Sequence, residues 1–287
     1  MQPALDFKPS LTRRQCALTG LVAGVGVALG SGGCAVAPTA RATGMDQGLD
    51  LYLLVGQSNM AGRGVVEAVD RTPSPRVLAL DAAGVWVPAA DPIHFDKSDI
   101  VGVGPGRSFG LAMAQAQPER RIGLVPCAVG GTRLALWEAG AQFKDTGARP
   151  WDDTVRRIGV ASVAGQWKGV LFHQGESDSN EADAPQYAAR LERLVLRLRA
   201  ALRAGTVPFL IGQMGHWKEL PWSAWRTLVD AAQRDAARQL SRTAFVSSAG
   251  LHHKGDFLHF DAPSARQLGQ RYAQAMLTMT SSSAAGV

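Results

Sequence analysis

One serine in the sequence has a setting that suits a nucleophile. An apolar run over residues 51–55 gives way abruptly to Gly56 and the polar triplet Gln57, Ser58 and Asn59. A serine hydroxyl is a weak nucleophile unless a neighbouring base takes its proton and a third group orients that base. If Ser58 attacks a substrate, the chain must therefore supply a histidine and a carboxylate from elsewhere.

The segment DFLH near the C-terminus offers both groups, with Asp256 and His259 three residues apart. On a turn or at the start of a helix, positions three apart lie on one side. Asp256 could then accept a hydrogen bond from Nδ1 of His259 and leave Nε2 free for Ser58. This spacing predicts a Ser-His-Asp arrangement for acyl transfer, although D-x-x-H by itself is also common in solvated turns.

An acyl-transfer site also needs hydrogen-bond donors for the negative oxygen of the tetrahedral intermediate. We expect three donors: the N–H of Ser58 at the start of a turn or helix, the N–H of Gly130 in AVGGT, and the side-chain amide of Gln174 in HQGESD. Structural alternatives stay open for two of them. Gly130 and Gly131 suit an ordinary turn, and Gln174 suits a buried amide that satisfies neighbouring backbone groups.

The elements that must position these residues alternate along the chain. Short apolar runs that predict buried strands occupy residues 51–56, 121–129, 168–174, 207–213 and 243–248. Helical periodicity occupies residues 106–117, 184–202, 222–240 and 263–277. This alternation predicts an α/β fold with about five parallel strands covered on both faces, and binding sites at the carboxyl ends of the strands.

The long insertion between Gly64 and Gly104 interrupts this alternation. Two short strands are expected within residues 76–92. Segments of this length in compact domains are usually functional or carry small structures of their own.

Composition predicts one globular domain over residues 46–280, followed by a disordered tail at 281–287. The chain has 287 residues, of which 46% are hydrophobic and 19% charged, enough for a sizeable core. Its net charge of +6 falls to +4 without residues 1–34. That mild basicity does not indicate a nucleic-acid partner. The sequence contains no feature that predicts an oligomeric state.

Residues 1–45 are predicted to form an export signal and a disordered linker. Arg13 and Arg14 precede an apolar run over residues 16–30, which is short for a membrane span, and then small residues. The paired arginines resemble a twin-arginine signal. Cleavage before Cys34 would allow lipidation and membrane attachment, and cleavage near AVA or PTA is the alternative. Either route predicts a periplasmic or secreted protein. The alternative is a cytoplasmic protein whose N-terminal segment is a disordered apolar tail.

Neither a metal nor a cofactor is expected. Cys127 is the only cysteine outside the predicted signal, so the mature chain has no internal disulfide and no cysteine cluster for zinc. His252 and His253 lie close to Asp256 and His259 in sequence, but adjacent histidines point in different directions and no H-E-x-x-H motif is present. The glycine-rich GVGPGR lacks the Lys-Ser/Thr ending of a phosphate loop.

Five segments in order, GQSNMAG, GPGRSFG, PCAVGGT…W, HQGESD and DFLHF, resemble the sialate O-acetylesterase-like and acetylxylan-esterase-like branch of the SGNH (GDSL-type) hydrolases. The resemblance covers residues 51–276. It implies a flavodoxin-like three-layer α/β/α sandwich and metal-free hydrolysis of O-acetyl esters on carbohydrates. By motif, Ser58 is then the nucleophile, His259 the base, Asp256 its partner and Gly130 the oxyanion glycine.

The resemblance also assigns supporting roles. Gln174 occupies the place where the wider superfamily has an asparagine donor, and this branch departs from the usual motif there. Glu176 is expected to be a buried structural carboxylate, and Gln57 and Asn59 are expected to fix the turn around the serine.

The expected partner is an acetylated carbohydrate such as xylan, sialic acid or peptidoglycan. Four tryptophans could stack on sugar rings or simply pack: Trp86, Trp137, Trp217 and Trp222. Two alternatives stay open, namely an inactive carbohydrate-binding protein on the same fold and a general short-chain ester hydrolase.

Overall fold

The computed structural model describes residues 48–284. The predicted export signal, including Cys34, lies outside the described residues. At the other end, helix α7 (Ala262–Ala284) includes the first four residues, 281–284, of the segment that was expected to be a disordered tail.

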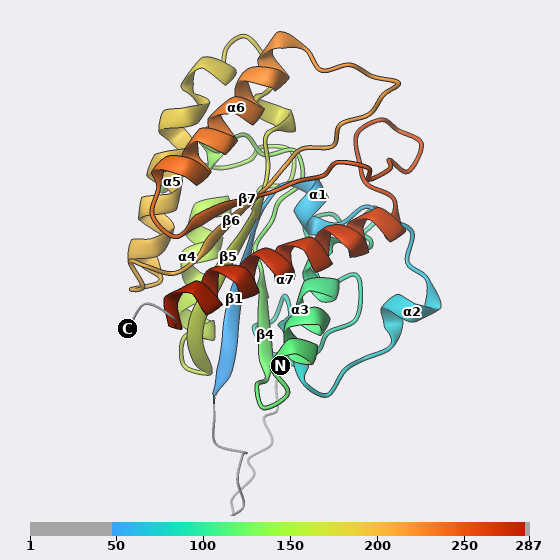
Figure 1. The fold of residues 1–287 in the computed structure, drawn as a ribbon, viewed down its shortest axis with the longest axis vertical. Helices are drawn as coiled ribbons and strands as arrows, with labels where there is room; N and C mark the ends of the chain where they lie inside the picture. The colour runs from blue at the N-terminus through green and yellow to red at the C-terminus, as the bar shows by residue number, and fades with distance from the viewer. Residues whose placement is uncertain (1–47, 285–287) are drawn as a thin grey trace, which may run out of the picture. The chain divides into compact units, whose positions relative to one another are not determined.

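A single seven-stranded sheet organises the described chain (Figure 1). Its strand order is β3-β2-β4-β1-β5-β6-β7, and every neighbouring pair is parallel except β2 with β3. The bounds are β1 (Leu49–Gly56), β2 (Val77–Leu80), β3 (Trp86–Pro88), β4 (Ile122–Pro126), β5 (Gly165–His173), β6 (Phe209–Gly212) and β7 (Thr243–Val246).

The five predicted parallel strands are β1 and β4 to β7, and the two short strands expected in the insertion are β2 and β3. The expected number of parallel strands is too low by one. Strand β2 belongs to the insertion but pairs with β4 in the main sheet, with Val77 opposite Ile122. Its four residues VLAL are too short to distinguish a sheet strand from one half of a separate hairpin.

Helices cover both faces of the sheet (Figure 1). Helices α3 (Pro105–Ala116) and α7 lie on one face, and α4 (Pro150–Ala161), α5 (Tyr187–Ala201) and α6 (Ala224–Gln239) lie on the other. Shorter pieces are α1 (Ser58–Ala61), α2 (Ala68–Arg71) and three 3₁₀ turns at Leu134–Leu136, Glu176–Asp178 and Ala184–Gln186. Among residues 48–284, no helix combines the length and the apolar composition needed to cross a membrane.

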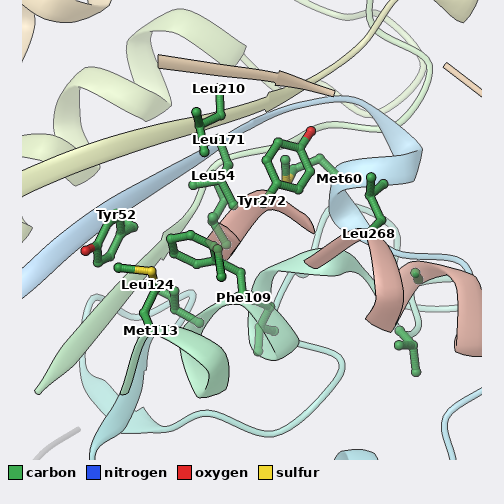
Figure 2. Close-up of a cluster of buried hydrophobic side chains, with 14 of the residues drawn as sticks. Tyr52, Leu54, Met60, Phe109, Met113, Leu124, Leu171, Leu210, Leu268 and Tyr272 are labelled. Atoms are coloured by element: carbon green, nitrogen blue, oxygen red, sulfur yellow. The ribbon is translucent and has the colours of Figure 1, made fainter. Parts of the chain in front are cut away.

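Strand β1 is buried on both faces because its alternate side chains enter two separate cores. Tyr52 and Leu54 belong to the core beneath α3 and α7, where the rings of Tyr52 and Phe109 meet edge to face at 4.8 Å (Figure 2). Leu51 and Leu53 belong to the core beneath α4, α5 and α6. The strand that leads to Ser58 is therefore held firmly from both sides.

Because β1 lies between β4 and β5, its carboxyl end faces the ends of both neighbours. Gly56 pairs with His173 of β5, and its carbonyl accepts a hydrogen bond from the N–H of Val129 beyond β4. The segments that follow these three strands consequently meet at one edge of the sheet.

Candidate active site

Ser58 is the first residue of α1, two residues after β1 ends. The turn requires glycine at position 56, where φ is +131° and a Cβ atom would lie 2.1 Å from the carbonyl oxygen of His173. Ser58 is 6% exposed. Within the described part of the chain, no acceptor binds its N–H.

The loop between β7 and α7 brings His259 to this serine. The Nε2 atom of His259 lies 2.9 Å from Oγ of Ser58, across 201 positions of sequence. On the other side of the ring, Nδ1 of His259 lies 2.7 Å from Oδ2 of Asp256. The three residues predicted to act together are therefore connected in the predicted order, from carboxylate to imidazole to hydroxyl.

Asp256 is held as an anion. Burial opposes its ionisation, but hydrogen bonds from the N–H of His259, the His259 ring and the N–H of Leu258 outweigh that effect and lower the pKa of Asp256 to about 2. An ionised carboxylate at Nδ1 favours the imidazole tautomer with its proton on Nδ1. That tautomer leaves a lone pair on Nε2 facing the serine hydroxyl.

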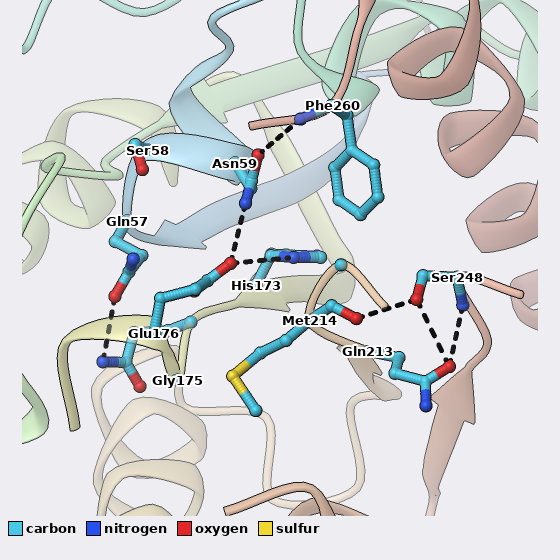
Figure 3. A network of polar contacts seen from close by, with 12 residues as sticks. Gln57, Ser58, Asn59, His173, Gly175, Glu176, Gln213, Met214, Ser248 and Phe260 are labelled. Atoms are coloured by element: carbon cyan, nitrogen blue, oxygen red, sulfur yellow. Dashed lines mark hydrogen bonds and ion pairs between the residues drawn. The ribbon is translucent and has the colours of Figure 1, made fainter. Parts of the chain in front are cut away.

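The two amides beside the serine bind different partners (Figure 3). Oε1 of Gln57 accepts hydrogen bonds from Nε2 of Gln174 at 3.2 Å and from the N–H of Ser177 at 3.4 Å, which ties the turn to the segment after β5. Asn59 donates to Oε1 of Glu176 at 2.7 Å and also reaches the loop that carries His259.

Gln174 does not serve as an oxyanion donor in this structure, which corrects the sequence-based expectation. It is fully buried, and its Nε2 donates to Gln57, to the carbonyl of Thr132 and to Asp178. Burial raises the pKa of Asp178 to about 6, although the hydrogen bond from the Gln174 side chain acts to lower it. The structural alternative, a buried amide that satisfies its neighbours, describes Gln174.

Gly130 is also engaged by the protein. Its N–H donates to Oδ2 of Asp96 at 2.8 Å, and Asp96 forms an ion pair with Arg63 at 2.7 Å. Both side chains of this pair are at most 2% exposed. Burial opposes the charge on Asp96, but the Arg63 hydrogen bond and charge keep the pKa of that carboxyl below its usual range. Of the three predicted donors, only the Ser58 N–H is therefore without a protein acceptor.

Sequence reasoning did not anticipate the Arg63–Asp96 pair. Arg63 follows the serine closely in SNMAGRG, so its position near the site could have been suspected. Asp96 lies in the insertion, and nothing in its spacing points to Gly130.

Glu176 is buried, as expected for a structural carboxylate, with a side chain that is 5% exposed. It lies 3.9 Å from Nε2 of His173 (Figure 3), which is fully enclosed. Burial lowers the pKa of His173.

The neighbouring histidines do not assemble into a metal site. Within residues 48–284, no group of three or more His, Cys, Asp or Glu side chains is arranged to hold a metal ion. Nδ1 of His253 accepts a hydrogen bond from the N–H of Gly255, and its ring packs against Trp217. His252 is exposed, and Oγ of Ser264 accepts its backbone N–H.

Two of the four candidate tryptophans are core residues. Trp137 and Trp217 are 1% and 3% exposed, so neither presents a ring face to a sugar. Trp86 and Trp222 are half-buried, and Trp222 donates its indole N–H to the carbonyl of Gly215.

Comparison with known proteins places this geometry in a family context. The family model described as "Carbohydrate esterase, sialic acid-specific acetylesterase" matches residues 48–278. The probable carbohydrate esterase At4g34215 of Arabidopsis thaliana is 31% identical over 248 residues, which cover 79% of this chain and 90% of that protein. Its X-ray structure superimposes with a TM-score of 0.71, covering 81% of this chain and 99% of that one.

Two more distant structures share the fold. NanS is 18% identical, with a TM-score of 0.67 over 83% of this chain and 100% of its own. A carbohydrate acetylesterase from Xanthomonas citri is 19% identical, with a TM-score of 0.60 over 79% of this chain and 55% of its own. The predicted three-layer α/β/α fold is confirmed.

Proposed function

The chain belongs to the carbohydrate esterase family of sialic acid-specific acetylesterases and is a hydrolase of ester bonds, and from that premise we propose that it removes O-acetyl groups from a carbohydrate through Ser58, His259 and Asp256. The observation that carries the proposal is the continuous chain of contacts, 2.7 Å from Asp256 to His259 and 2.9 Å from His259 to Ser58.

In the first half-reaction, Oγ of Ser58 attacks the acetyl carbonyl while Nε2 of His259 takes the hydroxyl proton. Asp256 stabilises the imidazolium that forms. The Ser58 N–H, which has no protein acceptor among the described residues, donates to the oxyanion. When the tetrahedral intermediate collapses, the C–O bond to the sugar breaks, His259 protonates the departing sugar oxygen, and the acetyl group stays on Ser58.

In the second half-reaction, His259 takes a proton from water, and the resulting hydroxide attacks the acetyl-serine carbonyl. Collapse of the second intermediate releases acetate and returns the proton from His259 to Oγ of Ser58. The cycle consumes one water and yields one free sugar hydroxyl and one acetic acid, which ionises to acetate and a proton, so the reaction balances without a cofactor.

The test is acetate release by the purified mature protein from O-acetylated sialic acid, acetylated xylan and O-acetylated peptidoglycan, with p-nitrophenyl acetate as a general ester. Ser58→Ala is expected to lower kcat by about 10⁴-fold or more. Ser162→Ala is the matched control, because the Ser162 hydroxyl bonds only within and just beyond α4.

A fluorophosphonate probe is expected to label Ser58 in the wild-type protein, which intact-mass spectrometry measures. An active Ser58→Ala variant would overturn the nucleophile assignment. Binding of acetylated glycans without acetate release would identify an inactive binding protein instead. Release from p-nitrophenyl acetate alone would favour a general short-chain esterase.

A further inference from the structure

We propose that Asn59 is a positioning residue that clamps the loop carrying His259 against the turn carrying Ser58, and that Glu176 holds Asn59 in the orientation this requires. The inference rests on the proposed role of His259 as the base. Neither residue needs to touch the substrate. Both residues act by fixing the position of the His259 imidazole ring.

The side chain of Asn59 binds the backbone on both sides of His259. Its Nδ2 donates to the carbonyl of Leu258 at 3.1 Å. Its Oδ1 accepts the N–H of Phe260 at 3.2 Å, as Figure 3 shows. Asn59 directly follows Ser58 in the chain. A single short side chain therefore links the position of the nucleophile to the position of the proposed base.

Glu176 fixes which way the amide of Asn59 points. Its Oε1 accepts the second Nδ2 hydrogen of Asn59 at 2.7 Å. A carboxylate can only accept, so a flipped amide would place Oδ1 against it and lose both bonds to the loop. The Glu176 side chain is 5% exposed, so its carboxyl group is largely removed from water and needs a hydrogen-bond donor such as the Asn59 amide.

The contacts of Asn59 add to the side-chain anchor that the loop has beside His259, the buried ring of Phe260, which packs against His173 and Trp217. Phe257 has a φ of +55°, in the left-handed region that bulky residues avoid, and it is 40% exposed. The bonds from Asp256 to Leu258 and His259 lie within the loop itself. In the described chain, the hydrogen bonds from this loop to the turn after β1 are the two made by Asn59 and the His259–Ser58 contact.

The experiment is a double-mutant cycle of Asn59→Ala with His259→Ala, assayed for kcat and KM on p-nitrophenyl acetate. We expect Asn59→Ala to lower kcat by about 10- to 100-fold, because a small displacement of a catalytic group is enough for such a loss. KM should change by less than about threefold. On the His259→Ala background, Asn59→Ala should cause no further loss.

A second set of variants tests the role of Glu176. Glu176→Ala is expected to lower kcat in the same way as Asn59→Ala, whereas Glu176→Gln keeps an acceptor oxygen and should retain most of the activity. The matched control is Asn180→Ala, which removes an equally well-bonded amide whose partners are Ser177 and Asp183. Its kcat should equal that of the wild type. Thermal unfolding of each variant reports whether it is folded.

A wild-type kcat in Asn59→Ala would overturn the clamp. So would a loss that persists without His259, because Asn59 would then act on Ser58 itself. If Glu176→Gln loses as much as Glu176→Ala, the charge of Glu176 acts directly and its positioning role is wrong. If Asn59→Ala does not fold, the comparison of kcat between Glu176→Ala and Glu176→Gln tests the proposal instead. Full activity in Ser58→Ala or His259→Ala would instead overturn the proposed function, and the clamp would fall with it.

Discussion

Replacing Asp256 by asparagine isolates the link between this residue and His259. Oδ1 of Asp256 accepts the backbone N–H groups of Leu258 at 3.0 Å and His259 at 2.8 Å, while Oδ2 alone contacts the imidazole. An asparagine that keeps its oxygen at the Oδ1 position preserves both backbone bonds. The reverse orientation would point an NH₂ group at two N–H donors, so we expect the first orientation and an intact loop.

In that orientation the asparagine donates to Nδ1 of His259, which forces the ring proton onto Nε2. Nε2 then donates to Oγ of Ser58 and can no longer take its proton. In a protease triad with the same chain of contacts, this substitution lowers kcat by about 10⁴-fold. Because the Asp256 side chain is 36% exposed and water can partly replace its charge, we expect a loss of about 10³- to 10⁴-fold, or roughly 4 to 5.5 kcal/mol in the barrier.

The assay compares kcat and the thermal midpoint of Asp256→Asn, Asp256→Ala and the control Asp261→Asn. Asp261 belongs to the same segment, but its carboxylate accepts the N–H of Ser264 at the start of α7. Asp256→Ala should lose more stability, since it leaves two backbone N–H groups without their acceptor, and should lose less kcat, since its imidazole is free to choose its tautomer. A folded Asp256→Asn variant that keeps more than about a tenth of wild-type kcat would refute the reasoning.

Three further outcomes are expected. The value of kcat/KM should rise from pH 5 to 8, where histidine side chains lose their proton, while Asp256 with its pKa of about 2 stays ionised; a flat profile would contradict a histidine base. Burial raises the pKa of Asp91 to about 7, so the folded state keeps a proton that the unfolded state releases, and the contribution of Asp91 to stability falls as the pH rises from about 4 to 7. Burial lowers the pKa of His94 to about 3 and acts in the opposite direction over this range, so the test compares two proteins: between pH 4 and 7 the thermal midpoint of Asp91→Asn should fall less, or rise more, than that of the wild type, and identical profiles would exclude a contribution from Asp91. Replacing Arg13 and Arg14 by lysine should leave the protein in the cytoplasm in cell fractionation, and unaltered export would contradict a twin-arginine signal.

Much of the fold could be predicted because its signals are local. A fully buried strand is an apolar run that ends at turn residues, and the segments containing β1, β5 and β6 all have this form. Helix α4 was not predicted, although Pro150 at its first position and Asp152 and Asp153 in its first turn are start signals. Trp151, Val155 and Ile158 also follow helical spacing, so the segment contained enough local signal for this helix to be predicted.

The site residues show the same difference between features with a local signal in the sequence and features that depend on tertiary contacts. Residues directly after strands could be assigned to one edge of the sheet, which placed Ser58 near the segment that contains His259 and Asp256. The engagement of Gly130 by Asp96 could not be predicted, because it depends on how the insertion folds back onto the end of β4. The same holds for Gln174, whose amide could bind an oxyanion or the protein, and only its surroundings decide which.

The topology attaches the nucleophile and the proposed base to different elements. Ser58 follows the central strand, but His259 lies in the loop that leads directly into α7, so its place depends on how that helix docks. Tyr272 of α7 is fully buried and donates its hydroxyl to the carbonyl of Phe172 at the end of β5, and Leu268 packs into the core beside α3 (Figure 2). Docking of α7 therefore anchors one end of the His259 loop to the sheet, while Asn59 binds Leu258 and Phe260, just before that helix, to the serine turn. A change that loosens α7 should reduce activity through the position of His259, because the loop that carries this residue leads directly into that helix.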